Sequence, residues 1–216
     1  MGKFYESKLY HFAQLVYELV RLNVVAVICS LPVVTAGAAW AALYCGIDAM
    51  ADGSASPVSV FFASFRKYFK RATLHWLFLL FFLILAAGDL IIFNTFSEEE
   101  IRPVAAVLPL ILTAFAMLAA GLLFPLIHVV TAGFRQTINI SLVFSLKYFL
   151  RAFFVLLLNV LPFALLYYRT AWFFRTIPVW LLVGFAAIAY ANTLVLQPAV
   201  NEILGILEEN ESGEGE

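Results

Sequence analysis

The sequence predicts an all-α protein of the membrane: a polytopic bundle of five or six transmembrane helices, with one basic and aromatic helix in the membrane interface. Of the 216 residues, 64% are hydrophobic and 12% are charged, whereas soluble domains average about 45–50% apolar and about 25% charged residues. The apolar residues also form runs that match a bilayer core of about 30 Å, which needs about 20 helical residues. An isolated strand would leave backbone groups unsatisfied in lipid, so each run is predicted to be helical.

Four apolar runs are long enough for one crossing each. They span residues 73–96, 104–130, 149–168 and 177–200. Within them only Arg151, near the edge of the third run, is a Lys or Arg. Together with the N-terminal region, these runs predict one membrane domain over residues 1–207. The acidic stretch 208–216 has almost nothing to bury, so it is predicted to be a disordered tail.

The N-terminal region allows two interpretations. Residues 22–50 contain no Lys or Arg, and this stretch is long for one crossing but short for two. Pro32, in its middle, removes a backbone donor and disfavours helical geometry at Leu31. One interpretation is a long kinked helix that crosses once after an interfacial helix. The other is a hairpin of helices 12–31 and 33–50 that turns at Pro32.

The distribution of basic residues favours the hairpin, because cytoplasmic loops carry an excess of Lys and Arg. With a hairpin, nine basic residues lie in the cytoplasm and three outside, with Arg21 in the membrane; with a single crossing the counts are seven and five. The nine are Lys3, Lys8, Arg66, Lys67, Lys70, Arg71, Arg135, Lys147 and Arg151. The hairpin places Glu18 and Arg21 at membrane depth, where their i, i+3 spacing lets them pair. Both interpretations place the C-terminus in the cytoplasm.

The segment 58–71 is predicted to be the interfacial helix. At about 100° per residue, Arg66, Lys67, Lys70 and Arg71 fill an arc of about 140°, and aromatic residues fill the opposite arc. Such a helix places its rings at the acyl boundary and its cations near lipid phosphates. Two roles remain open for the four cations, namely membrane anchoring and docking onto an acidic surface of a partner.

Polar residues inside the predicted membrane segments are the candidates for chemistry, because their burial is costly. They are Asp48, His75, Asp89, His128, Asn159, Asn192 and Gln197. Each also has a structural explanation, either a position near a helix end or a hydrogen bond to a neighbouring helix. No catalytic motif is recognisable, and the histidines and cysteines match no metal motif. We therefore predict no enzyme activity, catalytic residue, cofactor or metal site.

A short internal repeat is present. Residues 67–72, Lys-Tyr-Phe-Lys-Arg-Ala, recur 80 residues later as Lys-Tyr-Phe-Leu-Arg-Ala at 147–152, and Gly53 and Gly133 hold the same offset. Two explanations are open. Basic and aromatic residues flank many membrane entries, or a two-helix unit is duplicated, as it is in some transporters.

Three stretches carry a resemblance to a known family. The first comprises Leu22-Asn23, then Ser30-Leu31-Pro32-Val33-Val34-Thr35-Ala36-Gly37, then Ala41-Ala42-Leu43-Tyr44; the second runs from Phe61 to Trp76; the third is Phe124-Pro125-Leu126 with Thr137 and Asn139. In order and spacing they resemble the YesL family of bacterial membrane proteins, a family of unknown function. Its members are often encoded beside carbohydrate-uptake ABC transporters.

The resemblance implies a location and a neighbourhood but no mechanism. It implies a multi-pass protein of a bacterial plasma membrane that acts as a partner of a carbohydrate-uptake ABC transporter. The implied partners are the lipid bilayer and permease subunits, without nucleic acid; no oligomeric state follows. Pro32, Thr35 and Gly37 become the motif residues to test, with a helix break and tight packing as the plain alternative. A small autonomous transporter or channel is the second hypothesis, and an intramembrane enzyme is the least favoured.

Overall fold

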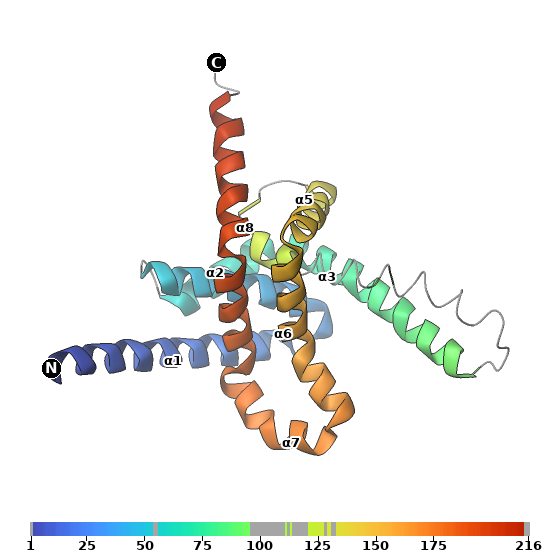
Figure 1. Cartoon of the computed structure of the whole chain (residues 1–216), viewed down its shortest axis with the longest axis horizontal. Coiled ribbons are helices and arrows are strands. Elements are labelled where there is room, and N and C mark those ends of the chain that lie inside the picture. Colours follow the sequence, from blue (N-terminus) through green and yellow to red (C-terminus); the bar gives the residue numbers. More distant parts are fainter. Residues whose placement is uncertain are drawn as a thin grey trace.

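The computed structural model describes residues 2–53, 56–95, 111, 113, 121–127, 129–130 and 133–213 (Figure 1). Its helices are α1 (Gly2–Ser30), α2 (Ala36–Asp52), α3 (Pro57–Thr95), α5 (Phe134–Lys147), α6 (Phe149–Tyr168), α7 (Thr170–Val179) and α8 (Phe185–Gly213). A 3-10 turn, η1 (Val33–Thr35), joins α1 to α2, and a π-helical segment, η2 (Trp180–Gly184), joins α7 to α8. No strand occurs in the described residues, so the predicted all-α class is confirmed.

Several of these helices are long and apolar enough to cross a membrane, which makes the chain a membrane protein. The candidate spans are Lys8–Ser30, Val33–Asp52, Pro57–Leu85 and Thr170–Ile206. A fifth is added if the pair Phe134–Lys147 and Phe149–Pro162, bent by 106°, is one span. The described residues thus contain four or five candidate spans, where the sequence predicts five or six crossings. Most of the predicted crossing over 104–130 lies outside them.

The N-terminal region contains two separate helices, α1 and α2, which pack against each other. Figure 1 shows them side by side, with α8 crossing both. Pro32 is extended, with φ −74° and ψ 116°, and it ends the first helix as its missing donor and fixed φ require. This is the geometry of the hairpin interpretation. The first helix is longer than predicted, because α1 begins at Gly2 rather than near residue 12.

Helix α3 joins two segments that the sequence predicts as separate. The predicted interfacial helix 58–71 and the membrane run 73–96 form one helix of 39 residues. No Pro or Gly lies between Pro57 and Gly88, so no residue in this stretch breaks the helix where its polarity changes. Phe61, expected at the acyl boundary, is fully buried in the protein core.

Helix α5 has no counterpart among the predicted segments. Its buried residues are Thr137, Ser141 and Ser145, spaced four apart on one face. Because that face is polar, the stretch contains no apolar run of membrane length. The helix ends at Lys147, and α6 leaves in a new direction, at 106° to α5.

The C-terminal helix extends further than predicted in both directions. The predicted run 177–200 lies within a helical stretch that starts with α7, passes through η2 and continues in α8. The far end of α8 projects away from the other helices (Figure 1). The backbone is helical up to Gly213, where the sequence predicts a disordered tail from residue 208. Glu is a good helix former, so this acidic stretch can continue the helix into water.

The core is built around α2. Small residues of α2 are almost completely buried against α1, α3 and α8; they include Ala38, Ala39, Ala41 and Ala42. Small side chains let helix backbones approach closely, which is how membrane helices gain packing energy. A second cluster joins residues 122–130 to α6 and α8 and includes Leu126, Val155 and Leu196.

Candidate functional site

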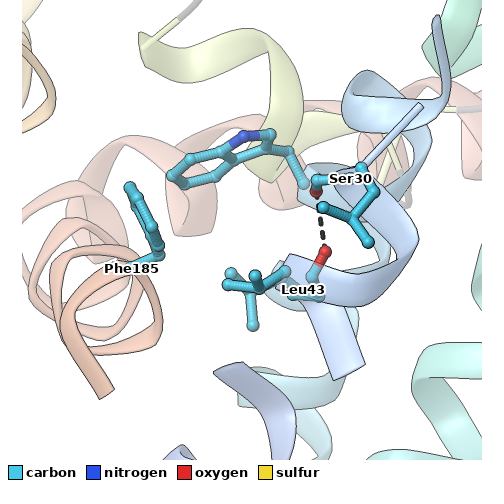
Figure 2. A pocket seen from close by; sticks show the side chains of 7 residues that line it. Ser30, Leu43 and Phe185 are labelled. Atoms are coloured by element: carbon cyan, nitrogen blue, oxygen red, sulfur yellow. Dashed lines mark hydrogen bonds between the residues drawn. The ribbon is translucent and has the colours of Figure 1, made fainter. Parts of the chain in front are cut away.

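A cavity of about 300 Å³ lies where α1, α2 and α8 meet, beside the turn that joins the first two helices. It is lined by Ala26, Val27, Ser30, Leu31, Trp40, Leu43 and Phe185. Figure 2 shows Ser30, Leu43 and Phe185 on different sides of this space. The first three of these residues belong to the end of α1, Leu31 lies in the turn after it, the next two belong to α2, and Phe185 opens α8.

The walls of the cavity are mostly apolar. Its one side-chain hydroxyl, on Ser30, donates to the carbonyl oxygen of Ala26 at 2.7 Å (Figure 2). The rings of Trp40 and Phe185 meet edge to face, with centroids 6.1 Å apart. The indole N–H of Trp40 is the remaining side-chain donor of the lining. Such a site favours an apolar ligand that fits its shape, because it offers few hydrogen-bond partners to a polar ligand.

The turn beside the cavity is held by Thr35, one of the predicted motif residues. The Thr35 hydroxyl lies 2.6 Å from the carbonyl oxygen of Cys29 and 2.8 Å from that of Pro32. These carbonyls belong to the end of α1 and the turn, where the helix itself supplies no donor. The indole N–H of Trp76 donates to the carbonyl oxygen of Val33 at 2.7 Å, which attaches the turn to α3.

Gly37, another predicted motif residue, lies at the closest approach of α2 and α3. A Cβ atom placed there would be 2.3 Å from the Cβ of Trp76 and 2.8 Å from the carbonyl oxygen of Ala72. Real Cβ atoms do not come this close to other atoms. Only glycine therefore permits this approach, and Pro32, Thr35 and Gly37 together shape the entry to α2.

The π-helical segment η2 is fastened to α1 by Asn23, which is completely buried. The Asn23 amide donates to the carbonyl oxygens of Trp180 at 3.0 Å and Leu181 at 2.7 Å. Its oxygen accepts from the backbone N–H of Ala186 at 2.8 Å. A π-helical turn shifts the hydrogen-bond ladder and leaves backbone groups to be satisfied from elsewhere. The amide of Asn23 supplies both the donors and the acceptor that this turn needs.

The four predicted cations of α3 separate into two groups. Arg66, Lys67 and Lys70 are exposed, and we call them the basic face. Arg71 is half-buried and donates to the Thr137 hydroxyl at 2.6 Å and to the carbonyl oxygen of Ile127 at 3.3 Å. Arg71 therefore connects α3 to α5 inside the protein, while the basic face is accessible to lipid or to a partner.

His75 lies one helical turn after Arg71 and is buried between helices. Its Nδ1 atom is 2.7 Å from the carbonyl oxygen of Arg71, and its ring centroid is 4.6 Å from that of Phe134 in α5. Within the described part of the chain, its Nε2 atom has no hydrogen-bond partner. Arg71 thus contacts α5 through a hydrogen bond, and His75 contacts it through its ring.

The two deep asparagines have different surroundings. Asn192 is fully buried and its amide donates to the Tyr44 hydroxyl at 3.1 Å, joining α8 to α2. The Asn159 amide donates at 2.7 Å to the carbonyl oxygen of Val155, four residues earlier in its own helix.

The structure describes two further polar candidates. Gln197 is exposed and Asp48 is half-buried near the end of α2. The side chain of Asp89 and all of His128 lie outside the described residues. No group of three His, Cys, Asp or Glu side chains in the described ranges could hold a metal ion.

The two copies of the repeat share side-chain contacts but not backbone geometry. The Lys67 ammonium lies 5.0 Å from the ring centre of Tyr68, and the Lys147 ammonium lies 5.8 Å from that of Tyr148. Each final arginine donates at 3.3 Å to a main-chain carbonyl of another element, Ile127 for the first copy and Val195 for the second. The first copy is inside continuous α3, whereas the second spans the bend between α5 and α6.

The bend itself is attached to α8. The Tyr148 hydroxyl donates to the Glu202 carboxylate at 2.6 Å, and Lys147 forms an ion pair with the same carboxylate. Arg151 adds its hydrogen bond to the carbonyl oxygen of Val195. These three residues, adjacent to the bend, all bind to α8.

Sequence reasoning missed two features of this site. Asn23 stands out in the sequence only as part of a motif, because its hydrogen-bond partners are backbone atoms 157 to 163 positions away. The cavity gave no signal, because its lining is apolar like the rest of the membrane segments. A buried amide within an apolar run was the one available hint.

A family model matches part of the chain. Residues 19–90 match the model of a family described as "Protein of unknown function, DUF624". No curated protein matches the chain, and no solved structure does. The matched stretch contains Asn23, the turn at Pro32, Gly37 and the basic face, and it covers a minority of the chain. The end of α1, all of α2 and most of α3 are therefore similar to a family of unknown function.

Proposed function

We propose that this protein is a non-enzymatic membrane partner of a carbohydrate-uptake ABC transporter in a bacterial plasma membrane. It docks through the basic face, Arg66, Lys67 and Lys70, on the cytoplasmic side, where the C-terminus also lies. The observation that carries the proposal is the exposure of these three cations beside a neighbour, Arg71, that is held inside the protein. The resemblance to the YesL family supplies the class of partner.

The length of α3 supports a position for the basic face outside the lipid core. At about 1.5 Å per residue, the 39 residues of α3 extend about 58 Å, against a bilayer core of about 30 Å. One end must therefore leave the hydrocarbon region. The end that carries Arg66, Lys67 and Lys70 is the favourable one, because charged side chains are costly at the bilayer centre.

The other buried polar groups join helices to one another, which supports a structural role for them rather than a catalytic one. Asn23 fastens α1 to η2, Asn192 joins α8 to α2, and Arg71 joins α3 to α5. Interhelical hydrogen bonds of this kind stabilise membrane bundles. The basic face makes no ion pair with any described residue, so it is free to meet acidic groups of lipid or of a partner.

The proposal is tested by crosslinking in native membranes, followed by affinity purification and mass spectrometry. The wild type is expected to recover a permease subunit of a carbohydrate ABC transporter. The triple variant Arg66→Glu, Lys67→Glu, Lys70→Glu is expected to lose it. The matched control, Arg169→Glu with Arg175→Glu, changes exposed cations on the opposite side and is expected to retain it. Recovery of the protein alone, with sugar uptake unchanged by its deletion, contradicts the proposal.

An autonomous transporter is the second candidate, and one observation favours it. Two interrupted helical paths, at Pro32 and at η2, lie next to the 300 Å³ cavity. Secondary transporters commonly place substrate sites at such interruptions. Solute flux in liposomes that contain only this protein would support this candidate. Absence of flux across a panel of sugars and ions, with folded protein verified, would remove it.

A further inference from the structure

We propose that the cavity between α1, α2 and α8 is a binding site for one acyl chain of a membrane lipid. This inference concerns the cavity alone and does not depend on the partner proposed above. Its ligand class follows from the lining, from the way the cavity reaches the surface, and from the contacts that keep it open.

The lining excludes water as a stable occupant. The space is large enough for about ten waters at about 30 Å³ each, but a buried water needs two to four polar partners. The Ser30 hydroxyl already donates to the Ala26 carbonyl. The Trp40 indole offers one further donor, and the side chains of Val27, Leu43 and Phe185 are hydrocarbon. Apolar cavities of this kind stay dry and take up apolar guests.

The cavity communicates with the surface of the protein through Leu31. Leu31 is part of the lining and is also 75% exposed. Next to it, Val33 and Val34 are exposed large apolar residues of the same turn. In a chain whose helices span a membrane, an exposed apolar rim contacts lipid. The apolar guest available at that rim is therefore an acyl chain.

Two fixed contacts keep the walls apart. The N–H of Ala186 is bound to Asn23, which anchors the start of α8 and with it Phe185. The tight contact of Gly37 with Trp76 anchors the start of α2, three residues before Trp40. Because both walls are held by neighbouring helices, the cavity cannot close by a simple shift of α2 or α8. An acyl chain gains packing contacts that the walls do not give each other.

The test is photolabelling in liposomes made of phosphatidylcholine with a diazirine in the middle of one acyl chain. Adducts are mapped by mass spectrometry on the full-length protein. Phe185 lines the cavity and is half-buried, so an acyl chain in the cavity can contact its ring. Leu22 is fully buried and is not part of the lining, so it gives the background. We expect Phe185 to be labelled well above Leu22, and exposed Leu31 to be labelled as well.

Cavity-filling variants complete the test. Val27→Phe is expected to reduce labelling of Phe185 to the background of Leu22, while labelling of Leu31 persists. Ile28→Phe, at the adjacent exposed position of α1, is the matched control and is expected to change nothing. Ser30→Leu is the second filling variant if Val27→Phe does not fold. Background labelling of Phe185 in the folded wild type, or undiminished labelling of Phe185 in a folded filling variant, overturns the proposal.

Discussion

Substitution of Gly37 by alanine tests the packing of α2 against α3. In the structure, the new Cβ atom would lie 2.3 Å from the Cβ of Trp76, whereas ordinary contact begins at 3.4 Å. A second contact, with the carbonyl oxygen of Ala72, would be 2.8 Å long. Neither atom is at the end of a flexible side chain, so rotamer changes cannot relieve the overlap. The two helices must move apart.

The magnitude follows from two opposing effects. Overpacking of a well-packed core costs typically about 1–3 kcal/mol, and a backbone displacement belongs at the upper end of this range. Alanine has a higher helix propensity than glycine, by about 1 kcal/mol, which offsets part of the cost. We therefore expect Gly37→Ala to lower the free energy of unfolding by about 2 kcal/mol.

The assay is reversible unfolding in mixed micelles with increasing sodium dodecyl sulfate, followed by far-UV circular dichroism. Gly205→Ala is the matched control, because Gly205 also lies inside a helix and has open space where a Cβ would be. It is expected to be neutral or to stabilise by up to about 1 kcal/mol. If both variants are as stable as the wild type or more so, α2 does not approach α3 at Gly37 as closely as described.

Three further predictions use the same unfolding assay. Asn23→Leu leaves two carbonyls and one N–H of the η2 region without partners and is expected to lower the free energy of unfolding by about 1–3 kcal/mol. The control Asn159→Leu removes a hydrogen bond within one helix and is expected to cost less. Equal effects of the two variants would contradict the role of Asn23. Arg71→Met removes charged hydrogen bonds to Thr137 of α5 and to the carbonyl oxygen of Ile127 and is expected to cost about 1.5–3 kcal/mol. The exposed control Lys70→Met should stay within about 0.5 kcal/mol, and the reverse order would refute the burial of Arg71. Glu202→Gln removes a solvent-accessible ion pair; because such pairs contribute little, it is expected to cost less than Arg71→Met, and a larger loss would show that the bend depends on this pair.

The helix class and the N-terminal hairpin could be predicted from the sequence, because they depend on local chemistry. Apolar runs of membrane length require helices. Pro32 ends a helix whatever its surroundings, since it lacks a donor and restricts the preceding residue. The same reasoning gave a wrong boundary at residue 72. A change from basic to apolar residues alters the solvent that a helix prefers but does not break its backbone, so α3 continues.

Other features could not be predicted because they depend on distant partners. α5 buries Thr137, Ser141 and Ser145, and a polar stripe gives no hydrophobic periodicity. Of the candidate site, Thr35 and Gly37 were singled out by motif, but the atoms that explain them belong to Cys29 and Trp76. Every residue has a backbone carbonyl, so the sequence does not mark that of Trp180 as a hydrogen-bond partner. It lacks a donor only because the π-helical turn shifts the hydrogen-bond ladder.

The π-helical turn also sets the rotational phase of everything that follows it in α8. An ordinary helix turns about 100° per residue, and a π-helical turn holds one residue more than an α-helical one. After it, the buried positions Asn192, Leu196, Ala199 and Ile203 form one stripe at spacings of four, three and four. Loss of a single residue from η2 would rotate that stripe about one third of a turn, away from Tyr44 and the second core cluster. Asn23, in α1, holds η2 in place and thereby fixes the rotation of α8 relative to α7.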